Sequence, residues 1–212
     1  QGEASFTWTV ADVNRSPIVT SPGAQSSAEG DAVSLTISGS DPDGDTLTWS
    51  VTGLPGGLGI DPGSGVVSGT IDFTATGSHS VTLRATDDGS PSLFTEVVFP
   101  WDVTDTNRAP LITNPGDRSN AEGDIVTFAI GGSDPDGDAV TWSATGLPTG
   151  LVIDPTSGVI SGDIKYSANS GSPWAVAVRA TDNGVPVLWS EVDFQWTVIN
   201  TNRRVDVINP GD

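Results

Sequence analysis

Short runs of the chain alternate hydrophobic residues with small polar ones. The clearest runs lie at residues 33–37, 47–51, 81–85 and 99–103, and many of their hydrophobic positions hold β-branched or aromatic residues. A period of two with these residue types predicts half-buried β-strands. Gly, Pro, Asp and Ser collect between the runs, as turns require, and no stretch keeps a helical period. The pattern therefore predicts an all-β protein.

The same pattern occurs twice along the chain. Residues 14–70 match residues 107–163 at a constant offset of 93, and after two extra residues near 169–173 the match continues at an offset of 95. The segment "FTWTVADVNR" at 6–15 is a further copy of the last strand of the repeat, and "INPGD" at 208–212 matches its beginning. A period this long is typical of tandem domains that each have their own core.

Each repeat is predicted to fold as a Greek-key β-sandwich of about seven strands, similar in shape to an immunoglobulin domain. The predicted boundaries place the last strand of a preceding repeat at 1–12, repeat 1 at 13–105, repeat 2 at 106–201 and the start of a following repeat at 202–212. We therefore expect the sequence to be a fragment of a longer repetitive protein.

The composition excludes several classes of function. The 212 residues include 27 acidic and 8 basic side chains, for a net charge of −19, and no cysteine or methionine. Without cysteine there is no disulfide framework, thiol nucleophile or zinc-thiolate site. A polyanion lacks the clustered Lys and Arg that bind nucleic-acid phosphates, and no apolar run approaches the ~20 residues of a membrane span. We therefore expect neither nucleic-acid partners nor membrane insertion.

The most acidic motif is "SDPDGD", which occurs at 40–45 and again at 133–138. Calcium takes roughly six to eight oxygen ligands, mostly from carboxylates and carbonyls, and alternate aspartates in one tight loop can converge on an ion. An EF-hand is excluded because Thr46 and Ala139 stand where its glycine is required. The alternative is an ordinary solvated turn, since Asp, Pro and Gly are common turn residues.

Further acidic and amide residues recur at equivalent positions. Glu29 and Glu122 lie in "AEGD" just before a predicted strand, and Asp87 and Asp182 lie in "RATD" at the end of another. Asp and Asn also recur where repeats join, as Asp12 with Asn14, Asp105 with Asn107, and Asn200 with Asn202. Because strand ends, a loop and a junction share one end of a sandwich, these oxygens can meet.

With these motifs the chain resembles the cadherin superfamily, and in particular bacterial dystroglycan-type cadherin-like and immunoglobulin-like (He-PIG) repeats. The resemblance covers nearly the whole chain, and its most specific element is "GLPTGLVIDPTSGVISG" at 146–162. Cadherins bind calcium between consecutive domains through a strand-proximal glutamate, a DxD loop, an AxD motif and a DxND linker. The resemblance thus implies tandem cadherin-like sandwiches with Ca²⁺ as the cofactor.

Carried onto this sequence, the resemblance implies a set of metal ligands. The junction between the two full repeats would use Glu29, Asp105, Asn107, Asp134, Asp136 and Asp182. The upstream junction would use Asp12, Asn14, Asp41, Asp43 and Asp87, and Glu122 with Asn200 and Asn202 would form half of a downstream site. Asp45 and Asp138 are further candidate ligands, with capping of the turn as their alternative role.

The sequence departs from the cadherin pattern in the linkers. Arginine stands where the pattern has a second linker acid, at Arg15, Arg108 and Arg203. Fewer anionic ligands imply fewer ions at each junction, about one or two in place of three. We expect Arg108 to pair with one of the collected carboxylates in place of an ion.

Catalysis is not expected. His79 is the only histidine, so the chain can form neither a serine triad nor a histidine-rich metal site. Paired acids could serve a glycosidase, but they recur in both repeats, which favours metal binding. Trp8, Trp101 and Trp196 share one strand position and are predicted to be core or sheet-packing residues.

The leading prediction is structural: calcium-rigidified stalk repeats of a bacterial surface or secreted protein, acting in an extracellular adhesin with neighbouring repeats of the same chain as partners. The alternative is a calcium-dependent carbohydrate-binding module, for which Trp174 and Trp189 are the candidate aromatic contacts. A third hypothesis is homophilic contact with another cell-surface copy through sheet edges.

Overall fold

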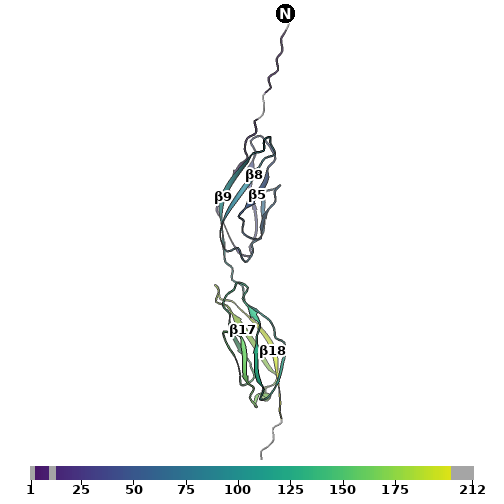
Figure 1. Ribbon diagram of the computed structural model, residues 1–212, viewed down its shortest axis with the longest axis vertical. Coiled ribbons are helices and arrows are strands. Elements are labelled where there is room, and N and C mark those ends of the chain that lie inside the picture. The colour runs from purple at the N-terminus through teal and green to yellow at the C-terminus, as the bar shows by residue number, and fades with distance from the viewer. Residues whose placement is uncertain (1–2, 10–12, 202–212) are drawn as a thin grey trace, which may run out of the picture. The chain divides into compact units, whose positions relative to one another are not determined.

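The computed structural model describes residues 3–9 and 13–201 of the 212-residue chain (Figure 1). The chain divides into two compact units after Thr106, and each unit has a hydrophobic core of its own. Within the described residues, no helix has the length and apolar character needed to cross a membrane.

Antiparallel pairing dominates the first unit. Its described residues form β1 (Ile18–Thr20), β2 (Gln25–Ala28), β3 (Ala32–Thr36), β4 (Ser38–Ser40), β5 (Thr48–Thr52), β6 (Leu58–Ile60), β7 (Val66–Thr70), β8 (Gly77–Thr86) and β9 (Phe94–Thr104). One sheet has the order β2-β9-β8-β5, a second has the order β3-β7-β6, and β1 pairs with β4. β2 runs parallel to β9, and Figure 1 shows β5, β8 and β9 side by side.

The second unit repeats this topology. Its described residues form β10 (Leu111–Ile112), β11 (Arg118–Ala121), β12 (Ile125–Ala129), β13 (Gly132–Ser133), β14 (Thr141–Thr145), β15 (Leu151–Ile153), β16 (Val159–Asp163), the 3₁₀ helix η1 (Ala168–Gly171), β17 (Trp174–Thr181) and β18 (Trp189–Ile199). The sheets have the orders β11-β18-β17-β14 and β12-β16-β15, with β10 paired to β13.

The predicted alternation is confirmed along the strands. On β9, Phe99, Trp101 and Val103 are buried while the residues between them are exposed, and the equivalent three positions of β18 are buried in the same way. Burial of a side chain such as Phe99 contributes roughly 1.5–3 kcal/mol. The inward faces of these long strands therefore supply much of the core that holds the two sheets of each unit together.

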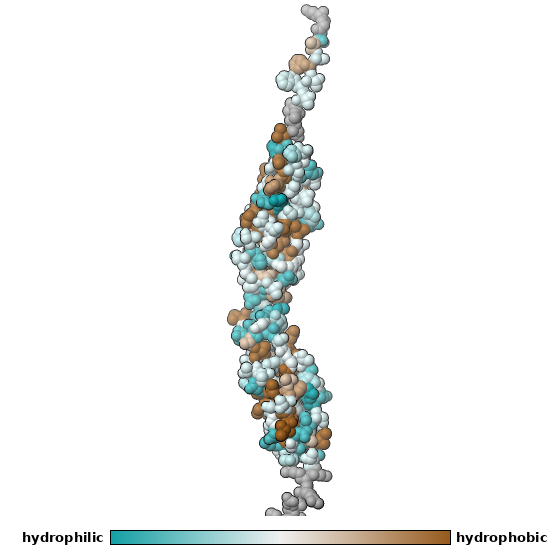
Figure 2. Space-filling view, in the orientation of Figure 1, coloured by the Kyte–Doolittle hydropathy of each residue, from teal (hydrophilic) through white to brown (hydrophobic). Residues whose placement is uncertain are grey.

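The outward positions leave hydrophobic residues on the surface at scattered places. On the face shown in Figure 2, hydrophobic residues form small patches among hydrophilic ones. Val98, Ile125 and Val152 are each more than half exposed. Isolated exposed hydrophobic residues of this kind are usual in folded domains.

Each unit contains more strands than the sequence pattern predicts. The described part of each unit has nine strands in place of about seven. The additional pairs are β1 with β4 and β10 with β13, which are two or three residues long. Because the sequences of β4 and β13 are only Ser and Gly, they carry no hydrophobic alternation from which a strand could be predicted.

The extra residues of the second repeat form η1. Ala168 at its start is buried, and the Trp174 indole Nε1–H donates to the Ala168 carbonyl at 2.8 Å. The insertion is therefore tied to the body of unit 2 by a buried alanine and a tryptophan side chain.

The prediction that Trp8 is a core or sheet-packing residue is wrong for this structure. Residues 3–9 form no strand, and the Phe6 and Trp8 side chains are 80% and 83% exposed, in edge-on contact with each other. A lone extended segment gains stability only by pairing with other strands. Within the described residues, no strand pairs with this segment.

A tryptophan anchors the strand that follows each acidic loop. In unit 2, the Trp142 backbone N–H donates to the Pro155 carbonyl at 2.9 Å, and the indole packs on Gly132 and Gly158. A Cβ added to Gly132 would lie 2.8 Å from Trp142 Cη2, and Gly158 has φ +67°. The hairpin between β15 and β16 thus holds β14, and with it one end of the acidic loop, in place.

Candidate functional site

The "DPDGD" loop of unit 2 folds around the side chain of Asp134. Asp134 Oδ1 accepts the backbone N–H groups of Asp136 at 2.8 Å and Asp138 at 3.4 Å. Gly137 has φ +85°, which favours glycine over other residues. Asp134 is only 9% exposed, and its Oδ2 is buried without a hydrogen-bond partner. The loop therefore buries a carboxylate with one unsatisfied oxygen.

Asn107 presents a second unsatisfied oxygen because its amide orientation is fixed. Its Nδ2 donates to Asp182 Oδ2 at 2.9 Å and to the Pro186 carbonyl at 2.7 Å. Both of those partners can only accept, so the amide nitrogen must face them. Asn107 Oδ1 then points elsewhere, and it is buried without a partner.

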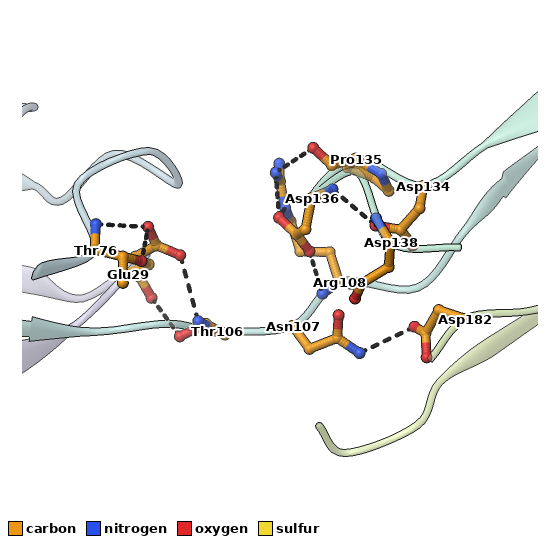
Figure 3. A network of polar contacts seen from close by, with 10 residues as sticks. All are labelled: Glu29, Thr76, Thr106, Asn107, Arg108, Asp134, Pro135, Asp136, Asp138 and Asp182. Carbon is orange, nitrogen blue, oxygen red and sulfur yellow. Dashed lines mark hydrogen bonds and ion pairs between the residues drawn. The ribbon is translucent and has the colours of Figure 1, made fainter. Parts of the chain in front are cut away.

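Asp138 and Gly184 complete this cluster. A Cβ added to Gly184 would collide with the Asn107 amide and with Asp138 Oδ2, so both side chains lie against the glycine backbone. Asp182 Oδ1 accepts the N–H groups of Gly184 and Leu188 at 3.2 and 2.8 Å, which fixes this loop after β17. The structure thus brings Asn107, Asp138 and Asp182 together at the end of the sandwich where Asp134 lies (Figure 3).

Unit 1 has the same arrangement. Asn14 Nδ2 donates to Asp87 Oδ2 at 3.1 Å and to the Pro91 carbonyl at 2.8 Å, and Asn14 Oδ1 and Asp41 Oδ2 are buried without partners. A Cβ added to Gly89 would collide with the Asn14 amide. The predicted ligand Asp12 lies outside the described residues.

Negative charge accumulates in the unit 1 cluster. Burial raises the pKa of Asp45, and the nearby carboxylates of Asp41, Asp88, Asp87 and Asp43 raise it further. A raised carboxyl pKa means that the charged form is disfavoured where it stands. A bound cation would remove this penalty.

Each "DPDGD" loop also binds an arginine from the segment before β1 or β10. Asp136 Oδ1 accepts Arg108 Nε at 2.8 Å and Nη2 at 2.5 Å, and its Oδ2 accepts the Arg108 backbone N–H at 2.7 Å (Figure 3). Hydrogen bonds from Arg108 hold the pKa of Asp136 below its usual value. Arg15 makes the same contacts with Asp43, so Asp43 and Asp136 already have a cationic partner. The predicted pairing of Arg108 with a collected carboxylate is confirmed.

Glu29 lies at the opposite end of unit 1 from Asp41 and Asp87. Its backbone N–H bonds Thr104 at the end of β9, whereas Asp87 lies beside the start of that strand. Glu29 Oε1 accepts the Thr76 backbone N–H at 3.0 Å and its hydroxyl at 2.6 Å, and Oε2 accepts the Thr106 N–H at 3.3 Å (Figure 3). Two recurring groups of acids therefore occupy opposite ends of each sandwich, and the expectation that all of these acids share one end is wrong.

The pKa of Glu29 reflects two opposing effects. Burial raises it, but the hydrogen bonds from Thr76 and Thr106, with a smaller contribution from Asp105, lower it by more, and the net pKa lies below the usual value. Glu29 is therefore a buried carboxylate that stays charged.

Glu122, the counterpart of Glu29, is less well satisfied. Its Oε2 accepts the Thr201 N–H at 3.2 Å, but its Oε1 is buried without a partner. The threonine that serves Glu29 has no counterpart here, because the insertion forms η1 at that place. Asn200 is exposed, and Asn202 lies outside the described residues.

The chemistry of these groups suits a hard cation. Carboxylate and amide oxygens are the ligands that calcium prefers, and a buried acceptor without a donor is unfavourable unless something neutralises it. No three His, Cys, Asp or Glu side chains in residues 3–9 and 13–201 converge as a metal-binding group. The asparagine amide and the backbone would therefore have to supply part of any coordination shell.

Sequence reasoning missed Gly89 and Gly184, which make room for the two asparagine amides. The sequence did contain an indication of these glycines, because a glycine follows the "RATD" aspartate by two positions in both repeats. Nothing in the sequence indicates that Asn14 Oδ1 and Asn107 Oδ1 lack hydrogen-bond partners, because this depends on which atom of each amide faces the carbonyl of Pro91 or Pro186.

The two tryptophans considered for sugar binding are differently placed. Trp174 is half-buried, with its indole N–H bonded to Ala168. Trp189 is 53% exposed, but the Arg179 guanidinium lies 3.9 Å from its ring centroid and also bonds Glu191 at 3.0 Å. One ring face of Trp189 is therefore already occupied by Arg179.

Comparison with known proteins identifies a domain type in both units. The model of the family described as "Putative Ig domain" matches residues 16–104 and 109–199. The serine-rich adhesin for platelets of Staphylococcus aureus strain MRSA252 is 40% identical over 118 residues, which are 55% of this chain and 8% of that protein. For the same adhesin from strain USA300 the identity is again 40%, over 5% of its length. The chain thus spans less than a tenth of these relatives.

Solved structures of animal cadherins share the fold. Drosophila N-cadherin EC1-4 has a TM-score of 0.54 at 19% identity, covering 88% of this chain and 50% of that one. Human CDH23 EC21-23 has a TM-score of 0.55 at 22% identity, covering 89% of this chain and 66% of that one. At these identities the likeness concerns the fold: tandem cadherin-like sandwiches.

Proposed function

The chain belongs to the Putative Ig domain family, with two such domains in tandem, and from this membership and its acidic clusters we propose that it forms calcium-binding repeats of a bacterial surface adhesin. The predicted family and the predicted all-β, cadherin-like fold are confirmed. The match to a staphylococcal surface adhesin supports a location at the cell surface and a role in contact with other surfaces.

The observation that carries the calcium proposal is the pair of unsatisfied buried oxygens in each unit. Asn107 Oδ1 and Asp134 Oδ2 lack donors in unit 2, and Asn14 Oδ1 and Asp41 Oδ2 lack them in unit 1. The same deficit recurs at equivalent positions of both repeats, which favours a common occupant. A divalent cation would be held by these oxygens with Asp138 or Asp45, and it would neutralise carboxylates that now repel each other.

The remaining predicted ligands take different roles in this proposal. Asp87 and Asp182 orient the asparagine amides, and they can share an oxygen with the ion. Glu29, Asp105 and Glu122 are proposed as further calcium ligands at the other end of each sandwich. To act as ligands, Asp43 and Asp136 would have to bind the ion through oxygens that already accept hydrogen bonds from arginine.

The proposed consequence is mechanical. Asn107 belongs to the segment that follows Thr106, where the chain divides into its two units. An ion held by Asn107 and Asp134 would tie that segment to unit 2 and restrict its conformations. Extracellular calcium modules bind with Kd of about 10⁻⁴–10⁻³ M, so occupancy is expected at millimolar calcium.

Melting with calcium and with a chelator tests the proposal. At calcium one hundred times above Kd, one ion adds roughly 2.7 kcal/mol to the folded state. For a unit of about 95 residues, 1 kcal/mol shifts the melting temperature by about 4–8 °C. The melting temperature is therefore expected to rise by about 10 °C or more in 10 mM CaCl₂ relative to EDTA when Kd is about 10⁻⁴ M. The calcium-dependent rise should be smaller in D134N and unchanged in D193N, the matched control, because Asp193 is an exposed acid on β18. Identical wild-type melting temperatures in CaCl₂ and in EDTA would rule calcium binding out.

A further inference from the structure

Unit 2 has a further place where polar groups are buried without partners, and its unsatisfied groups belong to residues other than the predicted metal ligands. A hollow of about 210 Å³ lies beside β11 and β12, the edge strands of the two main sheets. Arg118, Phe128 and Trp196 line it, and Ile125 on its rim is 81% exposed.

Two hydrogen-bond donors at this hollow are unsatisfied. Trp196 is only 1% exposed, and neither its Nε1 nor the buried Nε of Arg118 has a hydrogen-bond partner. Leaving a buried donor unpaired costs roughly 1–3 kcal/mol, so each such group in a folded domain needs an explanation. Because both groups can only donate, their missing partner is an acceptor.

The charge of Arg118 is also uncompensated. Of the five arginines that lie in the described part of the chain, Arg15, Arg84, Arg108 and Arg179 each pair with a carboxylate. Arg118 has no carboxylate partner among the described residues, although the chain carries 27 acidic side chains. Its guanidinium instead stacks 3.7 Å from the Phe128 ring centroid. Stacking of this kind presents the edge of the guanidinium to a planar anion.

At the equivalent place in unit 1 the donors have hydrogen-bond partners within the unit, so the unpaired donors are specific to unit 2. Gln25 replaces Arg118 and donates to the Pro22 carbonyl at 3.1 Å. Ser27 replaces Asn120, and its hydroxyl accepts the Trp101 Nε1–H at 3.3 Å. In unit 2, Asn120 Nδ2 donates to Asp124 instead, so Trp196 loses that partner.

We propose that this hollow binds a small organic carboxylate with a compact apolar body. The carboxylate accepts from the Arg118 guanidinium and from Trp196 Nε1, and the apolar body lies against Phe128 and Ile125. The volume is below the roughly 300–1,000 Å³ of sites for drug-sized ligands, so the ligand is small. This site is independent of calcium and of the proposed adhesin role.

The test follows the tryptophan indole signals in ¹⁵N–¹H NMR spectra during titration with sodium isovalerate at constant ionic strength. The Trp196 Nε1–H signal is expected to shift saturably, while the Trp101 signal stays in place. Isovaleramide, which has the same body without the charge, and sodium chloride are expected to produce no such shift. R118Q, which installs the residue of unit 1, should weaken the apparent affinity at least about tenfold, as expected for loss of a charge-assisted hydrogen bond.

Three results would each overturn the proposal. The first is a Trp196 signal that does not saturate. The second is the same response in R118Q, whose unchanged Trp101 signal and melting temperature would show that it is folded. The third is an equal shift with chloride or isovaleramide, which would mean that the hollow does not select a carboxylate.

Discussion

Arg108 donates hydrogen bonds to Asp136 from its backbone N–H and its guanidinium, so both oxygens of that carboxylate have a donor. Arg15 and Asp43 form the same contact in the other unit. A guanidinium is a permanent cation, so each "DPDGD" loop carries a built-in positive charge beside its unsatisfied oxygens. We infer that the arginine takes the place of one ion.

Replacing Arg108 should therefore increase the capacity of unit 2 for calcium. In R108Q, Asp136 loses its cationic partner and its oxygens become available as ligands. Calorimetric titration is expected to show tighter binding or one additional ion relative to the wild type. In EDTA the variant should be less stable by about 1 kcal/mol or less, as for other partly exposed ion pairs.

R84Q is the matched control for R108Q, because it removes the exposed Arg84–Glu96 pair on the sheet surface. Its calcium titration should match that of the wild type. Equal titrations for R108Q and R84Q would show that Arg108 does not substitute for an ion.

Adding a methyl group at Gly184 should disrupt the unit 2 cluster. The new Cβ of G184A would collide with Asn107 and Asp138, whereas a Cβ at Gly131 would meet Thr113 only at an ordinary 3.6 Å. Overpacking of this kind typically destabilises by about 1–3 kcal/mol. Denaturant unfolding should show that loss in G184A and a much smaller one in G131A, and calcium affinity should fall only in G184A.

Glu29 and Glu122 should respond differently to the same substitution in EDTA. In E29Q, one end of the amide becomes a donor that faces either Thr76 or Thr106, so we expect a loss of about 1–3 kcal/mol. In E122Q the amide nitrogen can occupy the position of Oε1, which has no partner, and the oxygen can still accept from Thr201. Chemical unfolding should therefore show E122Q near or above wild-type stability; equal losses in both variants would contradict the assigned hydrogen bonds.

The hairpin between β15 and β16 should contribute a pH-dependent part of stability. The Ser157 backbone N–H and hydroxyl, with the Thr156 N–H, hold the pKa of Asp154 below its usual 3.8. A group with a lowered folded-state pKa stabilises the fold above its unfolded pKa and loses that effect as the pH falls through the folded value. D154N should melt below the wild type at pH 7, and the difference should shrink below about pH 3.8. A difference that is constant across this range would contradict the assignment.

Much of the fold could be predicted from the sequence because it depends on local pattern. The alternation around Trp101 and Trp196 was enough to place both in cores, and the repeat offset was enough to find two domains. Trp8 has the same local pattern but is exposed, because burial also requires neighbouring strands to cover it.

The candidate site was only partly predictable. The motifs located Asn107, Asp134 and Asp182, and the arginine in the linker suggested an ion pair. Which oxygens are left without donors depends on side-chain orientation, as the amide of Asn107 shows. The hollow beside Arg118 depends on the replacement of Gln25 and Ser27 between repeats, whose effect is visible only when the partners of Trp101 and Trp196 are compared.

Calcium titration by calorimetry tests the central claim most directly, with the wild type compared to the double variant D41N/D134N. The wild type is predicted to bind at least one ion in each unit at submillimolar to millimolar calcium, and the double variant is predicted to lose one site per unit while D193N binds as the wild type does. A wild type that binds no calcium, or a double variant with unchanged stoichiometry and affinity, would contradict calcium binding at these clusters.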